Sequence, residues 1–210
     1  YSINDSLLLQ LRENVRYQRG VRDKFEASLI RSGLYLDQIR DTFEKYGLPT
    51  ELAAMPHVES SFNYNAYSSA GAAGVWQFTR GTGRYYMRID RYVDERLDPI
   101  KATDAAARLL NENFQALGNW PLALTSYNHG RNGMLRAKKQ HGPDLRIIIQ
   151  KYQSRYFGFA SKNFYSEFLA ALEVSKNYRK YFGDLEISER FEFDSILLDR
   201  SYDVSHFRSV

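Results

Sequence analysis

A single carboxylate, Glu59, stands in a stretch of the chain that otherwise holds mainly apolar, hydroxyl and small side chains. The stretch reads MPHVESSFNYNAYSSAGAAGVWQF over residues 55–78. On a helix, the neighbours three and four positions before Glu59 are Pro56 and Met55, and both are apolar. Because the charged form of a carboxyl loses hydration in such surroundings, we expect the pKa of Glu59 to be raised. A carboxyl that keeps its proton near neutral pH suits general acid catalysis.

A simpler interpretation of Glu59 is a helix-end side chain that points into water, as most glutamates do. The glycine-rich segment that follows favours the other interpretation, in which Glu59 belongs to a catalytic site. Gly71 and Gly74 permit a close approach of backbone or ligand, and Gln77 beside Trp76 adds an amide that both donates and accepts hydrogen bonds. Each signal is weak alone.

Metal and thiol chemistry are not predicted for this chain. It has no cysteine, so no disulfide can form, and its four histidines are scattered. No ligand cluster with zinc spacing therefore exists in the sequence, and we expect no metal and no cofactor.

Helical periodicity dominates the segments that must position these residues. Asp98 followed by Pro99 predicts the start of a helix that ends at Gly118. Pro56 predicts an irregular backbone near Glu59, and Ser161 is predicted to cap a long last helix. The predicted fold class is all-α.

The predicted organisation has three parts. Residues 1–48 form an N-terminal helical extension that packs on the catalytic domain, and residues 49–183 form that domain. Residues 184–210 form a C-terminal extension, interpreted as the start of a further module, in which residues 190–199 are a candidate for a short β segment.

Charge and hydropathy exclude two classes of protein. The 210 residues carry 29 basic and 25 acidic side chains, a formal net charge of +4. These charges are interspersed, so no nucleic-acid partner is predicted. No apolar run is long enough to predict a transmembrane segment. The chain begins at Tyr1 without an apolar leader, and we take it as a mature or trimmed piece.

Three motifs in order, HVESSFN, AYSSAGAAGVWQF and TSYNHG, resemble the signature motifs of the Slt-type lytic transglycosylases, in particular their D-type subgroup. The resemblance runs from about residue 10 to about residue 183. It implies a lysozyme-like helical domain related to goose-type lysozyme. It also implies cleavage of the peptidoglycan bond between N-acetylmuramic acid and N-acetylglucosamine without water, which leaves a 1,6-anhydro end.

The resemblance assigns catalysis to Glu59 alone. Glu59 would protonate the leaving glycosidic oxygen and then accept the proton of the C6 hydroxyl, so no second acid is needed, whereas ordinary glycosidases use two carboxylates. Substrate binding is assigned by the same match to six residues, the last of them standing beside a phenylalanine at the family's tyrosine position: Ser60, Ser68, Gln77, Tyr127, Asn128 and Tyr165.

The resemblance further implies a bacterial periplasmic or cell-envelope location, associated with the outer membrane, and a parent protein that carries a lipid anchor or wall-binding repeats. Two alternatives remain open from the residues. One is a hydrolytic muramidase that cleaves the same bond, and the other is a non-catalytic module that binds peptidoglycan. The product separates the lytic transglycosylase from the muramidase, because the first leaves an anhydro end and the second leaves a reducing end.

Overall fold

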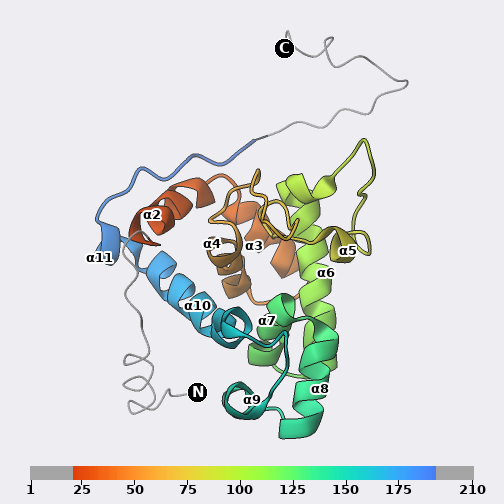
Figure 1. Ribbon diagram of the computed structural model, residues 1–210. Helices are drawn as coiled ribbons and strands as arrows, with labels where there is room; N and C mark the ends of the chain where they lie inside the picture. The colour runs from red at the N-terminus through yellow and green to blue at the C-terminus, as the bar shows by residue number, and fades with distance from the viewer. Residues whose placement is uncertain (1–20, 193–210) are drawn as a thin grey trace.

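The structure, a computed structural model, describes residues 21–192 as an assembly of helices (Figure 1). No strand occurs in this part of the chain, where β-type pairing is limited to isolated bridges. The predicted all-α class is therefore confirmed. In chain order the elements are α2 (Val21–Ser32), α3 (Leu36–Lys45), η1 (Thr50–Ala54), α4 (Met55–Glu59), α5 (Arg80–Gly83), η2 (Glu95–Leu97), α6 (Pro99–Leu117), α7 (Trp120–His129), α8 (Arg131–His141), α9 (Leu145–Lys151), α10 (Phe159–Lys176) and α11 (Tyr178–Phe182).

Helix α6 is the centre of the packing and contacts α3, α7 and α8. Its buried face is rich in alanine, including Ala102, Ala105 and Ala106, so neighbouring elements can approach closely. Trp76 is fully buried against this face, and its Nε1 donates to Thr103 Oγ1 at 2.9 Å. The loop after α4 is thus anchored in the main core.

Two helix boundaries on α6 agree with the prediction. The Asp98 side chain accepts hydrogen bonds from the backbone N–H groups of Ile100 and Lys101, and Pro99 opens the helix. Gly118 ends it with φ of 79°, a left-handed conformation that glycine adopts without strain.

The predicted cap of α10 is wrong. The helix begins at Phe159, three residues earlier than a cap at Ser161 predicts, and Gly158 precedes it. Ser161 lies inside the first turns, where its Oγ donates to Asn128 Oδ1 at 2.8 Å. The serine therefore joins α10 to the end of α7, a tertiary role that local capping patterns do not reveal.

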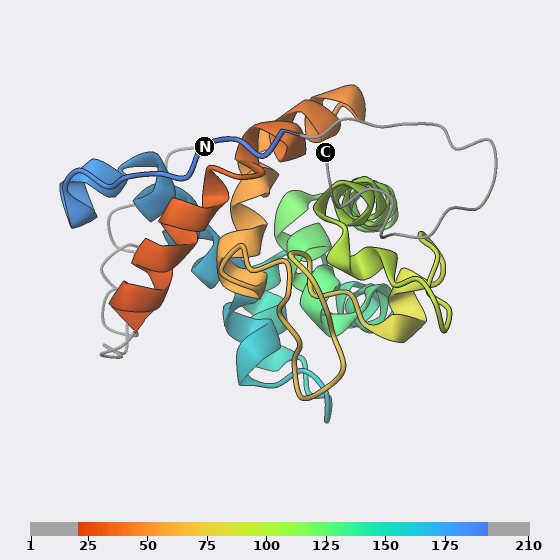
Figure 2. The same ribbon diagram turned by 90° about the horizontal axis from the view of Figure 1, so that it is seen from above.

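Residues 184–192, here called the C-terminal strap, run across α2 and α3 (Figure 2). The backbone N–H of Ser188 donates to the Ile30 carbonyl at 3.0 Å, and that of Phe191 donates to the Leu34 carbonyl at 3.0 Å. A Cβ on Gly33 would collide with the Ser188 carbonyl. Of the predicted β segment, residues 190–192 form no strand, and the remainder lies outside the described residues.

Among residues 21–192, no helix has the length and the apolar character needed to cross a membrane. Helices α2 and α3 contact α4, η1 and α6 directly. Helix α2 thus packs on α4, which carries the start of the first motif, while the division of the chain into three parts stays a prediction.

Candidate active site

Glu59 is the last residue of α4, and the chain turns sharply after it. The backbone N–H groups of Ser60 and Phe62 both donate to the Pro56 carbonyl at 3.1 Å. Ser61 and Phe62 have φ of 54° and 57°, a left-handed conformation that is uncommon for residues other than glycine and is enriched at functional sites. The irregular backbone predicted from Pro56 is therefore observed.

The Glu59 carboxyl is partly exposed but closely surrounded by protein. Burial, with a smaller contribution from the negative charge of Glu167, raises its pKa from the ordinary 4.5 to about 8. Within the described residues no hydrogen bond engages this carboxyl. At neutral pH the side chain therefore carries a proton that is not committed to another protein group.

Glu167 is a second carboxyl near Glu59, and sequence analysis missed it. It lies on α10, which packs directly against α4, at the border of the buried face that includes Phe164 and Ala171. Partial loss of hydration also raises the pKa of Glu167 itself. In the sequence, its position three residues after Phe164 indicates that it lies near the buried face of its helix. Only the packing of α10 on α4 shows that this face brings it close to Glu59.

Tyr127 lies on the other side of Glu59, on α7. Its hydroxyl donates to the Trp76 carbonyl at 2.8 Å, and its ring meets Phe78 edge-on with centroids 6.0 Å apart. Burial first, and then the nearby Glu59 charge, raise the pKa of Tyr127 well above its ordinary value. Tyr127 thus stays protonated beside the acid. Trp76 contributes its carbonyl here, while its ring belongs to the core.

Three of the predicted sugar-binding side chains bond the backbone of their own loop. Ser60 Oγ donates to the Val75 carbonyl at 2.8 Å, and Ser68 Oγ accepts from the Ala72 N–H at 3.0 Å. Gln77, with φ of 49°, donates through Nε2 to the Gly74 carbonyl at 2.9 Å. These bonds hold the loop of residues 60–78 in one shape over Glu59, and contacts of the three residues with sugar stay predictions.

Arg96 is a further part of this loop's support that sequence analysis missed. Its guanidinium is only 3% exposed and pairs with Asp94 at 2.7 Å. One of its nitrogens also donates to the carbonyls of Gly71 and Phe78, at 2.8 and 3.0 Å. A Cβ on Gly74 would collide with the Arg96 carbonyl. The glycine-rich segment of residues 71–74 therefore allows the loop to pack closely against η2.

The remaining predicted residues lie on α7 and α10. Asn128 is exposed at the end of α7, and its Oδ1 accepts the Ser161 hydroxyl. Tyr165 is half-buried between the two parts of the core and stacks on Phe168 at 6.3 Å. No hydrogen bond joins Tyr165 to Glu59 in residues 21–192, so a role for Tyr165 in binding stays a prediction.

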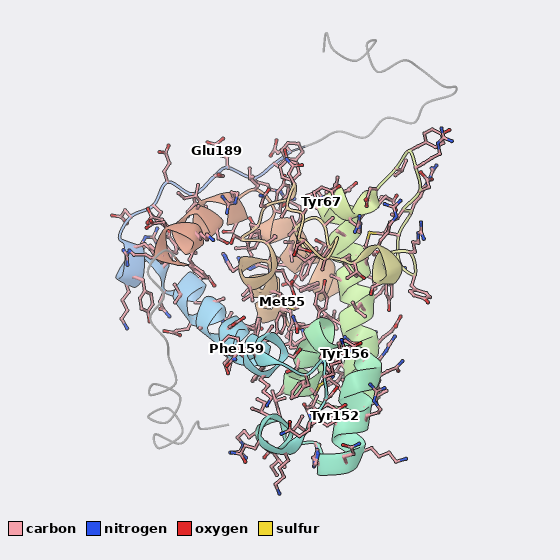
Figure 3. The ribbon with its side chains drawn as sticks, in the orientation of Figure 1. Met55, Tyr67, Tyr152, Tyr156, Phe159 and Glu189 are labelled. Atoms are coloured by element: carbon pink, nitrogen blue, oxygen red, sulfur yellow. The ribbon has the colours of Figure 1, made fainter. Side chains whose placement is uncertain are left out.

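A cavity of about 780 Å³ begins at Tyr127 and extends between α6, α7 and α8. Tyr156, labelled in Figure 3, lies at its edge and is 75% exposed. Glu112 accepts hydrogen bonds from the Tyr86 hydroxyl and from Arg131, both at 2.8 Å. Exposed aromatic rings with fixed polar groups between them suit the alternating faces and hydroxyls of a sugar chain.

Within the described part of the chain, no three histidine, aspartate or glutamate side chains gather in a way that would hold a metal ion. Glu59 is the candidate proton donor of this site, and its neighbour Tyr127 also lines the polar cavity.

Comparison with known proteins agrees with the motifs. The 70 kDa soluble lytic transglycosylase of Escherichia coli superposes with a TM-score of 0.50 at 22% identity, over 69% of this chain and 24% of that one. This likeness shows a shared lysozyme-like helical fold. A model of the Transglycosylase SLT domain family matches residues 39–148. The chain belongs to the transglycosylase SLT domain family.

The chain is also similar to two membrane-bound lytic murein transglycosylases. Membrane-bound lytic murein transglycosylase D of Escherichia coli K12 is 31% identical in an alignment 189 residues long that covers 85% of this chain and 41% of that protein. Membrane-bound lytic murein transglycosylase F of Pectobacterium atrosepticum is 27% identical in an alignment 207 residues long that covers 88% of this chain and 42% of that protein. The chain thus spans about two fifths of the length of these relatives.

Proposed function

We propose that this chain is the catalytic domain of a lytic murein transglycosylase that cleaves the glycan strands of peptidoglycan and releases 1,6-anhydro-muramic ends. The observation that carries the proposal is the Glu59 carboxyl, whose pKa is raised to about 8 and which has no hydrogen-bond partner in the described chain. It stands in the first of the three motifs that resemble those of the Slt-type lytic transglycosylases, and two relatives of the chain are named lytic murein transglycosylases.

The proposed reaction uses Glu59 twice. Its proton passes to the glycosidic oxygen while the bond from that oxygen to C1 of the muramic sugar breaks, and the 2-acetamido group stabilises the positive charge at C1. The C6 hydroxyl oxygen then bonds to C1, and its proton passes to the Glu59 carboxylate. The acid is regenerated, the 1,6-anhydro ring closes and no water is consumed.

The neighbours of Glu59 would support both halves of this cycle. The negative charge of Glu167 favours the protonated acid before cleavage. Tyr127, which the nearby carboxylate also keeps protonated, holds the loop through its bond to the Trp76 carbonyl. Ser60, Ser68, Gln77, Asn128 and Tyr165 remain the proposed sugar contacts, with the first three also fixing the loop.

Peptidoglycan is the proposed partner, and nucleic acid is not one. The relatives are named membrane-bound, so we place the parent protein in the bacterial cell envelope, on its periplasmic side. A lipid anchor or wall-binding repeats in the parent protein would bring the domain to its substrate.

A hydrolytic muramidase is a second candidate, because Glu167 offers a second carboxyl. In inverting and retaining glycosidases a second carboxylate activates water or attacks C1. Muropeptides released from purified sacculi separate the two candidates by mass spectrometry. We expect anhydro ends, which are lighter than reducing ends by one water. Reducing ends as the main product would replace the proposed function by hydrolysis.

A further inference from the structure

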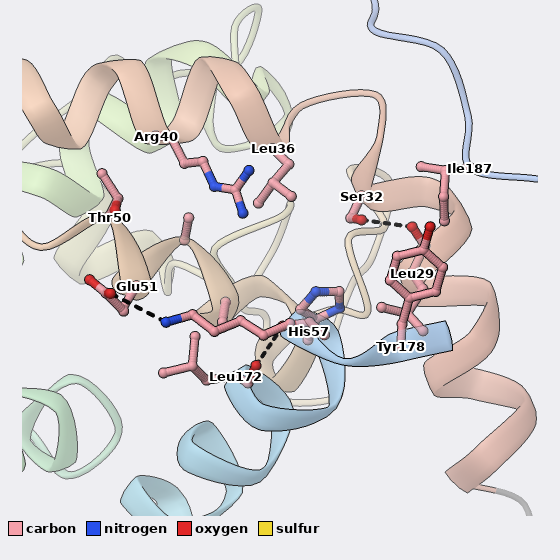
Figure 4. Close-up of a pocket in the computed structure, with 14 residues that line it drawn as sticks. Leu29, Ser32, Leu36, Arg40, Thr50, Glu51, His57, Leu172, Tyr178 and Ile187 are labelled. Carbon is pink, nitrogen blue, oxygen red and sulfur yellow. Dashed lines mark hydrogen bonds and ion pairs between the residues drawn. The ribbon is translucent and has the colours of Figure 1, made fainter. Parts of the chain in front are cut away.

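A second cavity, of about 380 Å³, lies behind α4 and is separate from the proposed catalytic cleft (Figure 4). It is enclosed by α2, α3, η1, the last turns of α10 and Ile187 of the C-terminal strap. His57 forms part of its wall. Because two residues that are two positions apart on a helix project to opposite sides, His57 and Glu59 face different spaces. We call this cavity the rear pocket.

Aliphatic side chains from four helices and the C-terminal strap line much of the rear pocket. They are Leu29, Leu36, Ala53, Leu172 and Ile187. The volume is near the lower end of the range for ligand-binding pockets, about 300–1,000 Å³. This part of the pocket fits a ligand with a small aliphatic body.

The polar part of the rear pocket favours an anion. Arg40 reaches from α3 toward the cavity (Figure 4), and Lys176 at the end of α10 also lines it. Lys176 Nζ pairs with Glu51 at 3.3 Å, so one of the two cations is balanced. Arg40 pairs with Asp37 at 3.7 Å, with both side chains about half exposed, a geometry worth little. Its charge also acts on Glu51, which helps to lower the pKa of that carboxyl, but no hydrogen bond engages the Arg40 guanidinium within residues 21–192.

Two hydroxyls complete the lining. Thr50 and Tyr178 both face the cavity, and neither side chain makes a hydrogen bond within residues 21–192. A hydroxyl can donate to a carbonyl or accept from an N–H, so these groups match a peptide unit. The planar guanidinium fork of Arg40 matches the two oxygens of a carboxylate.

We propose that the rear pocket binds the carboxylate end of a short peptide with alanine-sized side chains. The carboxylate would meet Arg40 and Lys176, and the methyl groups would pack on the aliphatic wall. Peptide units would meet Thr50 at one end of the pocket or Tyr178 at the other (Figure 4). Peptidoglycan stem peptides have this chemistry where they end in D-alanine. The pocket's preference for such a peptide stands on its lining, while the choice of a peptidoglycan stem rests on the proposed function.

The probe that tests the rear pocket is N-acetyl-D-alanyl-D-alanine, titrated into the protein by calorimetry, with its C-terminal amide as the matched ligand. We expect the acid to bind at least about tenfold more tightly than the amide, since hydrogen bonds to a charged group are the stronger ones. Arg40→Gln should weaken binding of the acid by about tenfold or more. Arg146→Gln makes the same change on α9, away from the pocket and 68% exposed, and should bind as the wild type does.

Several results would overturn the proposal. They are no binding of the acid at millimolar concentration, equal binding of acid and amide, unchanged binding in Arg40→Gln, or equal weakening in the Arg146 control. Competition by a chitin tetrasaccharide would place the peptide in the catalytic cleft and would also overturn it. Circular dichroism and thermal melts confirm that each variant is folded.

The binding titration needs no glycan cleavage, so its result is independent of the sacculus assay. Binding without cleavage would count against the proposed function alone. Cleavage without binding would count against the rear pocket alone.

Discussion

Two side chains on opposite sides of α4, His57 and Glu59, are both driven toward their neutral forms. Burial lowers the pKa of His57 to about 3. Burial, helped by the Glu167 charge, raises the pKa of Glu59 to about 8. The same physical cause acts on both, yet the neutral histidine has lost a proton and the neutral glutamate still holds one.

The surroundings of the two groups decide what each can do. His57 is 6% exposed, lies 2.7 Å from Ser28 Oγ through Nδ1, and is enclosed by the rings of Phe25 and Phe62. Glu59 is more exposed and has no hydrogen-bond partner in the described chain. A perturbed pKa therefore indicates a functional group only when the proton can be reached, and the enclosed His57 imidazole is a structural group.

The largest expected effect comes from Glu59→Gln. The amide keeps the shape of the carboxyl but cannot deliver a proton, so clearance of purified sacculi should fall by a factor of about 10² or more. Glu44→Gln, exposed on α3, is the matched control and should clear at the wild-type rate. Clearance above about a tenth of wild type would contradict the assignment of Glu59 as the acid.

The same variant should be more stable than the wild type at alkaline pH. The pKa of Glu59 is raised in the folded state, to about 8 from 4.5, so its contribution to stability is present below pH 4.5 and is lost as the pH rises through 8. Glutamine avoids this loss. In urea unfolding at pH 8, the free energy of unfolding of Glu59→Gln should exceed that of the wild type by about 1–3 kcal/mol. This figure is discounted for the partial exposure of the side chain.

The next largest effect concerns His57, whose contribution to the stability of the fold depends on pH in the opposite direction. The pKa of His57 is lowered in the folded state, to about 3 from 6.5. Between these two pH values the histidine binds a proton in the unfolded chain but not in the folded chain. The free energy of unfolding therefore falls as the pH falls. From pH 6.5 to pH 4 the loss from this group should be roughly 3 kcal/mol.

His57→Gln should reduce that acid sensitivity, because the amide has no proton to bind. Urea unfolding at pH 7 and pH 4 measures the difference, with His141→Gln as the control for a partly exposed histidine. Carboxylates contribute equally to all three proteins, so only the difference between variants counts. Equal acid slopes in His57→Gln and wild type would show that His57 is not a buried neutral base.

The contrast between the two sides of α4 also marks what the sequence could reveal. Helical period, Asp98, Gly118 and the proline near Glu59 depend on neighbours within one turn, and these predictions agree with the structure. The cap assigned to Ser161 was wrong, because its hydroxyl bonds Asn128 on another helix. Local patterns do not contain that contact.

The environment of the candidate site was only partly predictable for the same reason. The raised pKa of Glu59 follows from the apolar residues beside it in the chain, and the structure agrees. Glu167 is 108 positions later by residue number, and its effect depends on α10 packing against α4. The loop bonds of Ser60 and Gln77 depend on left-handed backbone turns that no residue type there would require.

The smallest expected effect, and the sharpest test of the Glu59 side, comes from Glu167→Gln. Removing this charge leaves burial as the cause of the raised pKa of Glu59, so that pKa should fall but stay above its ordinary value. The alkaline limb of the pH–rate profile should therefore move toward acid by less than about one pH unit. The rate at acidic pH should hardly change.

Digestion of soluble glycan strands across this pH range measures the shift, with Glu173→Gln on the exposed side of α10 as the control. An unchanged alkaline limb would mean that Glu167 does not act on Glu59, and burial alone would tune the acid. Loss of turnover at every pH would instead make Glu167 a participant in the chemistry, as the hydrolytic candidate requires. Because a tuning charge and a catalytic base change different parts of the same profile, one variant decides between the two roles of the second carboxyl.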